Sequence, residues 1–169
     1  MALYKIWNGP SPTTASQIAV TTGTAIKTML QFVPSATLGA RVVEWGVSLD
    51  GAAAAAGVQC ELLETDVAAT VTAHVAAGIV KYDNAALLGG DPTTNLIQVG
   101  VAATGYTASA EGSIAAVRML DAQFVQPTNQ YLIQFPLGRD AWVQTGKFLR
   151  VRVKAAVAVN MLCYVLVEM

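Results

Sequence analysis

The stretch RVVEWGVSLDG at residues 41–51 decides the fold class of this chain. Polar or small residues alternate in it with bulky apolar ones. Four apolar side chains share one side of this stretch: Val43, Trp45, Val47 and Leu49. A period of two is that of a β-strand with one face against a core, and Asp-Gly is a typical turn signal. We therefore predict a central strand over 41–49, with Trp45 and the other three side chains buried.

Similar short runs, separated by Pro, Gly, Asn and Asp, follow along the rest of the chain. The strands that this pattern predicts are 3–7, 26–33, 41–49, 58–64, 96–101, 106–110, 115–124, 131–135, 148–153 and 159–167. Many short strands with irregular connections are typical of a β-sandwich rather than of a regular barrel. We expect an all-β fold: a single β-sandwich domain over 1–169, Greek-key or jelly-roll-like, with long loops.

Residues 66–80 are ambiguous. Alanine favours a helix there, and Val67, Val71, Val75 and Ile79 recur every four residues, but β-branched side chains favour a strand. Both readings stay open.

Residues 8–23 carry no charge and are rich in Ser and Thr. Pro10 and Pro12 disfavour helix and sheet pairing, so we predict an extended N-terminal arm or loop that packs on a neighbouring protein surface. Its docking candidates are Pro10, Pro12, Thr13 and Thr14. Because the predicted core strands lie outside the arm, its deletion is expected to leave the sandwich folded.

Length and composition limit the classes of function. The chain has 169 residues, a net charge of −1 from 10 basic and 11 acidic residues, and 54% hydrophobic residues with only 12% charged ones. Such a charge balance argues against nucleic acid as a partner. The longest apolar stretches, 67–80 and 155–167, are shorter than a membrane span, and no secretory signal is visible. We expect neither nucleic acid nor membrane binding.

The most regular charge pattern lies near the C-terminus. Arg150, Arg152 and Lys154 alternate with Leu149, Val151 and Val153, so the cations share one strand face while the aliphatic side chains face the core. That face is expected to be a solvated outer face of a sheet. The alternative is a basic docking surface for an acidic protein.

Few residues point to catalysis. His74 is the single histidine and has no carboxylate nearby in sequence, so we expect a structural role. The acidic cluster Glu61, Glu64 and Asp66 is expected at a solvated strand end, with a calcium site as the alternative. Cys60 and Cys163 are expected to be free buried thiols, and a bridge between them remains open. We predict no catalytic residue, cofactor or metal.

The chain resembles small proteins encoded among the virion genes of tailed phages and prophages of actinobacteria, which are minor capsid or head-decoration proteins. The resemblance extends over nearly the whole chain and is carried by the following segments: 4–7, 9–13, 22–28, 44–51, 60–62, 67–74, 127–131, 134–139 and 147–153.

This resemblance implies a structural, non-enzymatic protein made in the host cytoplasm and located on the capsid surface of the virion. The major capsid protein would be its partner. We also expect a homo-oligomer, with a trimer as the expected form, because so apolar a chain leaves little polar surface for a monomer. The alternative is a tail-associated carbohydrate- or receptor-binding module that uses exposed aromatic residues such as Trp7, Trp142 or Tyr106.

Overall fold

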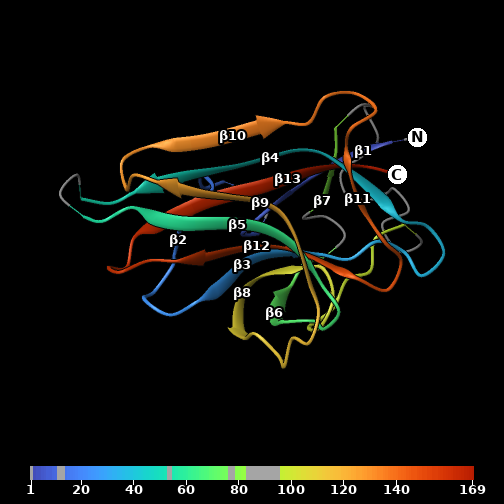
Figure 1. Ribbon diagram of the computed structural model, residues 1–169, viewed down its shortest axis with the longest axis horizontal. Helices are drawn as coiled ribbons and strands as arrows, with labels where there is room; N and C mark the ends of the chain where they lie inside the picture. Colours follow the sequence, from blue (N-terminus) through green and yellow to red (C-terminus); the bar gives the residue numbers. More distant parts are fainter. Residues whose placement is uncertain (1, 11–13, 53–54, 76–78, 83–95) are drawn as a thin grey trace.

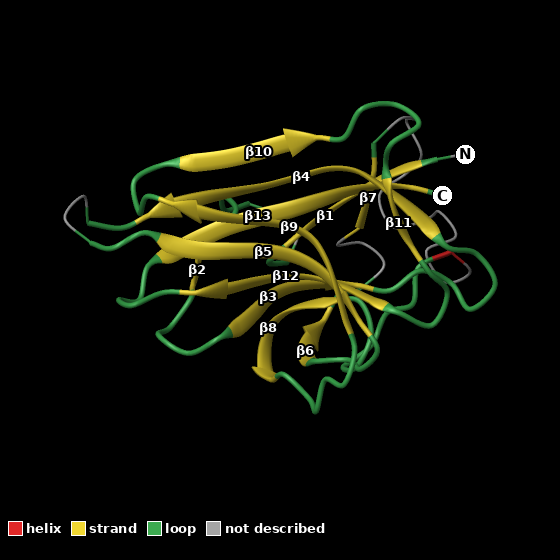
Figure 2. Ribbon diagram, in the orientation of Figure 1, coloured by secondary structure: helices red, strands yellow, loops and turns green. Residues whose placement is uncertain are grey.

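A computed structural model describes residues 2–10, 14–52, 55–75, 79–82 and 96–169. Apart from a short helical segment at Leu96, the elements in these ranges are β-strands (Figure 2). The strands are β1 (Leu3–Trp7), β2 (Val20–Thr21), β3 (Lys27–Phe32), β4 (Ala40–Asp50), β5 (Val58–Thr65), β6 (Thr70–Ala73), β7 (Ile79–Lys81), β8 (Gly105–Ala110), β9 (Val117–Val125), β10 (Gln130–Gln134), β11 (Ala141–Val143), β12 (Phe148–Lys154) and β13 (Asn160–Glu168).

The strands form two antiparallel sheets that pack against each other as a β-sandwich (Figure 1). We call them sheet A, with the order β10-β4-β13-β1-β7, and sheet B, with the order β6-β8-β3-β12-β5-β9. In sheet A, β11 also pairs with β4, and β2 pairs with β13. Because successive strands such as β3, β4 and β5 cross between the sheets, the connections are of the Greek-key or jelly-roll kind that was predicted.

Strand β13 holds sheet A together. It pairs with β4 from Asn160 to Glu168, and its other edge pairs with β1 and β2. The N-terminal and C-terminal strands are therefore neighbours, and Ala2 and Met169 exchange two backbone hydrogen bonds beyond the ladder.

The core lies between the two sheets and consists of side chains from both. Trp45 is 0% exposed, and its ring packs edge-on against that of Tyr131, 5.5 Å away. The Trp45 Nε1 donates a hydrogen bond of 3.1 Å to the carboxylate of Asp121, which also accepts from the Tyr131 hydroxyl. The indole is therefore both buried and satisfied, as a buried tryptophan requires. The prediction that Trp45, Val47 and Leu49 are buried is confirmed.

A β-bulge in β4 corrects the prediction for Val43. Leu166 pairs with Glu44, but the next residue, Val167, pairs with Val42, so Val43 is an extra residue in the ladder. A bulge exchanges the two faces of a strand. Val42 therefore enters the core with 0% exposure, while Val43 is only partly buried.

Most predicted strands are confirmed, within a few residues at their ends, but three regions differ. Residues 96–101 form only isolated bridges, so the strand predicted there is wrong. Residues 66–80 contribute β6 to sheet B and β7 to sheet A, so the strand reading holds for their described part and the helix reading does not. The short strands β2 and β11 were not predicted.

The arm at 8–23 is tied into the sandwich at both ends. The Asn8 side chain, 0% exposed, donates to the Met161 carbonyl and accepts from the Cys163 amide, each at 2.9 Å. At the other end, the Thr22 hydroxyl accepts from the Val159 amide, and β2 pairs with β13. The expectation that this segment lies outside the core is therefore wrong for its ends. The buried Asn8 side chain takes the hydrogen-bonding place of a strand residue at the edge of β13.

We expect Trp45→Ala to lower the free energy of unfolding by about 3–5 kcal/mol, because it empties a large volume in the core and removes the hydrogen bond to Asp121. The measurement is urea denaturation followed by circular dichroism. Trp142→Ala is the matched control, since Trp142 is 47% exposed, and its effect should stay within about 1 kcal/mol. Equal effects of the two substitutions would contradict the assignment of Trp45 to the core.

Candidate interaction surfaces

The three cations of β12 share one face of the strand, as the alternation predicted. Leu149, Val151 and Val153 point into the core and are 0–1% exposed. The surroundings of the cations differ: Arg150 is 0% exposed, Arg152 is half-buried and Lys154 is exposed. The expectation of a solvated face is therefore wrong for Arg150.

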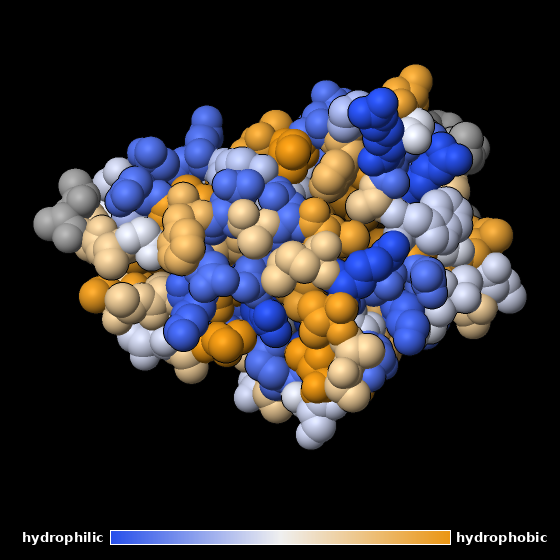
Figure 3. Space-filling view, in the orientation of Figure 1, coloured by the Kyte–Doolittle hydropathy of each residue, from blue (hydrophilic) through white to orange (hydrophobic). Residues whose placement is uncertain are grey.

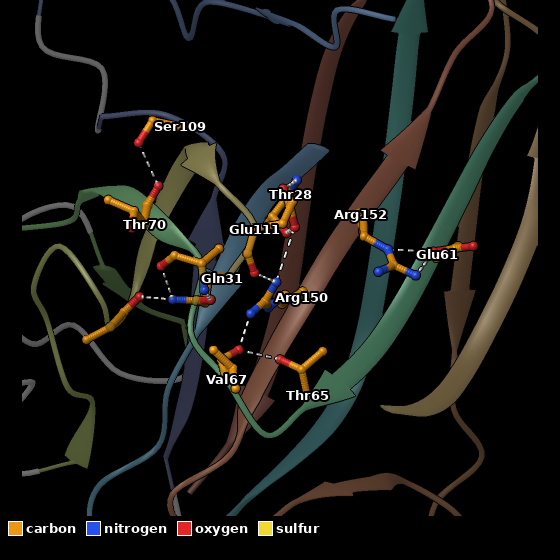
Figure 4. Close-up of polar contacts among 12 residues, drawn as sticks. Thr28, Gln31, Glu61, Thr65, Val67, Thr70, Ser109, Glu111, Arg150 and Arg152 are labelled. Atoms are coloured by element: carbon orange, nitrogen blue, oxygen red, sulfur yellow. Dashed lines mark hydrogen bonds and ion pairs between the residues drawn. The ribbon is translucent and has the colours of Figure 1, made fainter. Parts of the chain in front are cut away.

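The cause is a layer of chain that folds over the outer face of sheet B. Arg150 donates to the carbonyl and carboxylate of Glu111, at 3.0 and 3.2 Å, and to the carbonyl of Val67 (Figure 4). The Glu111 carboxylate in turn accepts from the amide and hydroxyl of Thr28. Arg150 therefore connects the segments around residues 67 and 111 to β3 and β12. Its buried Nε has no hydrogen-bond partner.

Gln31 makes a second connection beside Arg150. Its amide oxygen accepts from the Ala69 amide at 2.8 Å, and its nitrogen donates to the Ala103 carbonyl at 2.7 Å. Gln31 is 0% exposed. Arg150 and Gln31 form hydrogen bonds with backbone groups of the covering segments, so both side chains have a structural role.

Arg152 and Glu61 form an ion pair with an N–O distance of 2.8 Å. Glu64 accepts from Arg118 and from the Gln144 amide, both at 2.9 Å, and Asp66 accepts from the amides of Ala115 and Ala116. These amide bonds hold the pKa of Asp66 below its usual value. The three acidic residues thus have separate partners, and no metal-binding group of His, Cys, Asp and Glu occurs in the described ranges.

Removal of the Arg150 guanidinium should be strongly destabilising. Arg150→Met leaves the partly buried Glu111 carboxylate without its cation and removes one of the two donors to the Val67 carbonyl, so we expect a loss of about 3–5 kcal/mol in the free energy of unfolding. Lys154→Met, on the same strand face, should change it by only about 0.5 kcal/mol. Adding Glu111→Gln to Arg150→Met should recover part of the loss in a double-mutant cycle. Additive effects of the two substitutions would contradict the coupling.

His74 is buried, with 3% exposure. Its Nε2 lies 2.8 Å from the Trp7 carbonyl, and its ring centroid lies 4.9 Å from that of Tyr106. Trp7 belongs to sheet A and Tyr106 to sheet B, so the imidazole joins the two sheets at one end of the sandwich. Burial lowers the pKa of His74, and the hydrogen bond to Trp7 opposes this only in part. The ring is therefore neutral at pH 7 and plays the structural role that was predicted.

The lowered pKa of His74 predicts a pH dependence of stability. The unfolded chain binds the proton near the usual pKa of 6.5 and the folded chain only at lower pH, so unfolding takes up a proton between the two values. The contribution of His74 to the free energy of unfolding should therefore be fully present above pH 6.5 and should decrease as the pH falls below 6.5. His74→Gln should flatten this part of the profile, measured as urea midpoints from pH 7.5 to 5.5. An unchanged slope in the variant would contradict this assignment.

Cys60 and Cys163 are free thiols, both 0% exposed. Burial raises the pKa of Cys60 to about 12 and that of Cys163 well above its usual value. Both are therefore protonated and unreactive in the folded protein. This confirms the expectation of free buried thiols over a bridge.

The docking candidates of the arm are only partly described. Pro10 and Thr14 are exposed, whereas Pro12 and Thr13 lie outside the described residues. Ile18, in the same loop, is 72% exposed.

The aromatic residues considered for a sugar platform belong to three different strands. Trp7 belongs to β1 in sheet A, Tyr106 to β8 in sheet B, and Trp142 to β11. The Trp7 ring packs against Tyr164, and Lys5 Nζ lies 5.0 Å from the Trp7 centroid and 3.9 Å from that of Tyr164. The Trp7 ring is therefore engaged within the protein.

A surface that the sequence did not single out follows the edge strand β9. A bulge at Leu120 places four small or apolar side chains on the same outward face: Val117, Met119, Ala122 and Phe124. Val117 is 49% exposed, Met119 48% and Phe124 78%. We call these four residues the β9 row. Figure 3 shows apolar patches among polar ones on the face that carries β9 and β5.

The β9 row could not be recognised from alternation alone. The bulge at Leu120 changes the phase of the strand between Met119 and Asp121, so a regular strand would place Val117 and Phe124 on opposite faces. Apolar side chains at this exposure on the last strand of a sheet are typical of a contact surface between proteins.

Within the described residues, no helix has the length and hydropathy needed to cross a membrane. Comparison of the chain with protein-family models, with curated proteins and with solved structures gives no match.

Proposed function

We propose that the chain is a structural virion protein, a minor capsid or head-decoration protein that binds the outside of an assembled phage head and stabilises it. Its partner is the major capsid protein, its own assembly is a homo-oligomer with a trimer as the expected form, and it acts without catalysis. The resemblance of its segments to the virion proteins of actinobacterial phages is the origin of this proposal.

The observation that carries it is the β9 row. Among the described strands, β9 is the last one of sheet B. An edge strand presents unpaired backbone donors and acceptors, and soluble proteins usually protect such an edge with charges, proline or a covering segment. Phe124, in this row, is 78% exposed. A protein that is permanently seated on an assembled shell has this surface covered by its neighbour, so the row favours a docking function.

The ionisable groups support the same conclusion. Arg118, Arg150 and Arg152 each pair with a carboxylate, and the neutral His74 joins the two sheets. These ionisable groups stabilise the fold by contacts with other parts of the chain and do not line a common cleft. This arrangement favours a structural protein over an enzyme.

The proposal predicts that the purified chain co-sediments with heads assembled from the major capsid protein encoded in the same genome. Phe124→Gln combined with Met119→Gln should weaken this binding at least about tenfold, because truncation of apolar anchors in an interface costs more than 1 kcal/mol each. Light scattering on the free protein should give the mass of a homo-oligomer.

Leu38→Gln is the matched control for that experiment. Leu38 is 51% exposed but lies in the loop between β3 and β4, away from β9, so its substitution should leave the binding unchanged. Absence of co-sedimentation at micromolar concentration contradicts the head-decoration proposal. Binding to a glycan array instead would favour the tail-associated module.

A further inference from the structure

One end of sheet A is hollowed. The hollow has a volume of about 460 Å³, and its apolar walls come from Leu3, Val43, Phe135, Pro136 and Leu137. Gln134, Asp140 and Glu168 complete the lining. A volume of this size lies within the range of specific binding pockets. We call it the end pocket.

Two features indicate that the end pocket is built to receive a group. The bulge in β4 turns Val43 out of the core and into the pocket wall, and such bulges commonly re-aim a side chain at a functional position. Leu137 is 96% exposed at the rim. A leucine held so far from the core gains nothing from folding of the single chain.

The charged residues that line the end pocket are both carboxylates. Asp140 is nearly buried, with a side-chain exposure of 8%, and its partner Arg41 is 3.9 Å away, beyond hydrogen-bond distance. The backbone of Glu168 pairs with Leu3 and Arg41 in the sheet, but its carboxylate has no hydrogen bond or ion pair among the described residues. An apolar pocket with two under-satisfied carboxylates suits a cation that is attached to an apolar group.

The opposite end of the sandwich presents that combination. Lys154 ends β12, is exposed and has no ion pair within the described ranges, and Val157, in the turn that follows, is 58% exposed. Lys27 pairs with Val153 in the register, so Ile26, which is 49% exposed, lies at the same end. We call Ile26, Lys154 and Val157 the basic tip.

The end pocket and the basic tip lie at the two ends of one strand. The basic tip precedes the first residue of β13, Asn160, and the end pocket contains its last residue, Glu168. Nine residues of strand span about 30 Å, and Figure 1 shows the turn between β12 and β13 at the left and the C-terminus at the right. The two surfaces therefore cannot meet within one copy of the chain.

We propose that the end pocket of one copy receives the basic tip of a second copy, with Lys154 against Glu168 and Val157 against the apolar wall. The contact is head-to-tail, and repetition of such a contact closes into a ring when the rotation between copies allows it. This inference rests on the homo-oligomer of the proposed function and identifies its interface. It leaves the β9 row free for the capsid.

Reversal of the two charges tests this interface. We expect Lys154→Glu and Glu168→Lys to weaken self-association at least about tenfold each, because each places like charges opposite one another. The chain with both substitutions should regain the wild-type association, since it restores the pair with reversed signs. Analytical ultracentrifugation over a concentration series gives the dissociation constants, and circular dichroism checks that each variant is folded.

Lys147→Glu is the matched control. Lys147 lies just before β12, at the opposite end of that strand from Lys154, so the variant has the same charge change away from the basic tip and should associate like the wild type.

Two outcomes overturn the proposed contact and leave the oligomer in place. One is a wild-type oligomer that neither single reversal weakens, or that the double reversal fails to restore. The other is loss of head binding by Glu168→Lys with self-association intact, which would assign the end pocket to the capsid protein. If the wild-type chain is monomeric in this assay even at about 100 micromolar, the proposal of a homo-oligomer is itself contradicted.

Discussion

The insertion of β13 between β4 and β1 is the constraint on which the rest of the structure depends. One edge of β13 pairs along nine residues with β4, and the other edge holds β1, Asn8 and β2. The last strand of the chain therefore fixes the first strand, both ends of the arm and the longest strand at once. Sheet A cannot be completed until the C-terminal segment is present, and the pairing has the long sequence separation that slows folding.

Next to β1, the side chain of Asn8 takes over the pairing with β13 that a strand backbone would otherwise make. Between β1 and β2 the backbone leaves the edge of β13, and the Asn8 amide group bonds Met161 and Cys163 in its place. A buried amide that satisfies one backbone donor and one acceptor continues the ladder without continuing the strand. The loop that begins there is therefore anchored at its base, while residues such as Thr14 and Ile18 remain exposed.

The sequence predicted the strands well and their surroundings less well, for a physical reason. Alternation reports which side chains share a face, so Trp45 and the aliphatic residues of β12 were placed correctly. It does not report bulges, which exchanged Val42 with Val43 and produced the β9 row around Leu120. Nor does it report what covers the outer face of a sheet. Arg150 is buried because segments more than 35 residues away in sequence fold over it, and no local pattern contains that information.

The use of charge in this protein connects its fold to its surface. Only 12% of the residues are charged. Three of the arginines, Arg118, Arg150 and Arg152, form ion pairs with carboxylates of the same chain. A buried pair adds little net stability compared with an apolar packing of the same shape, but it fixes one arrangement of the covering segments. Charges used in this way are not available to keep the surface solvated. The outward side chains of β9 and the rim of the end pocket are consequently apolar, with Phe124 and Leu137 the extreme cases. A chain of this composition gains more from covering these surfaces with neighbours than from exposing them. In the head-to-tail contact that we propose, Lys154 and Glu168, whose side chains have no ion pair among the described residues, determine which surfaces meet.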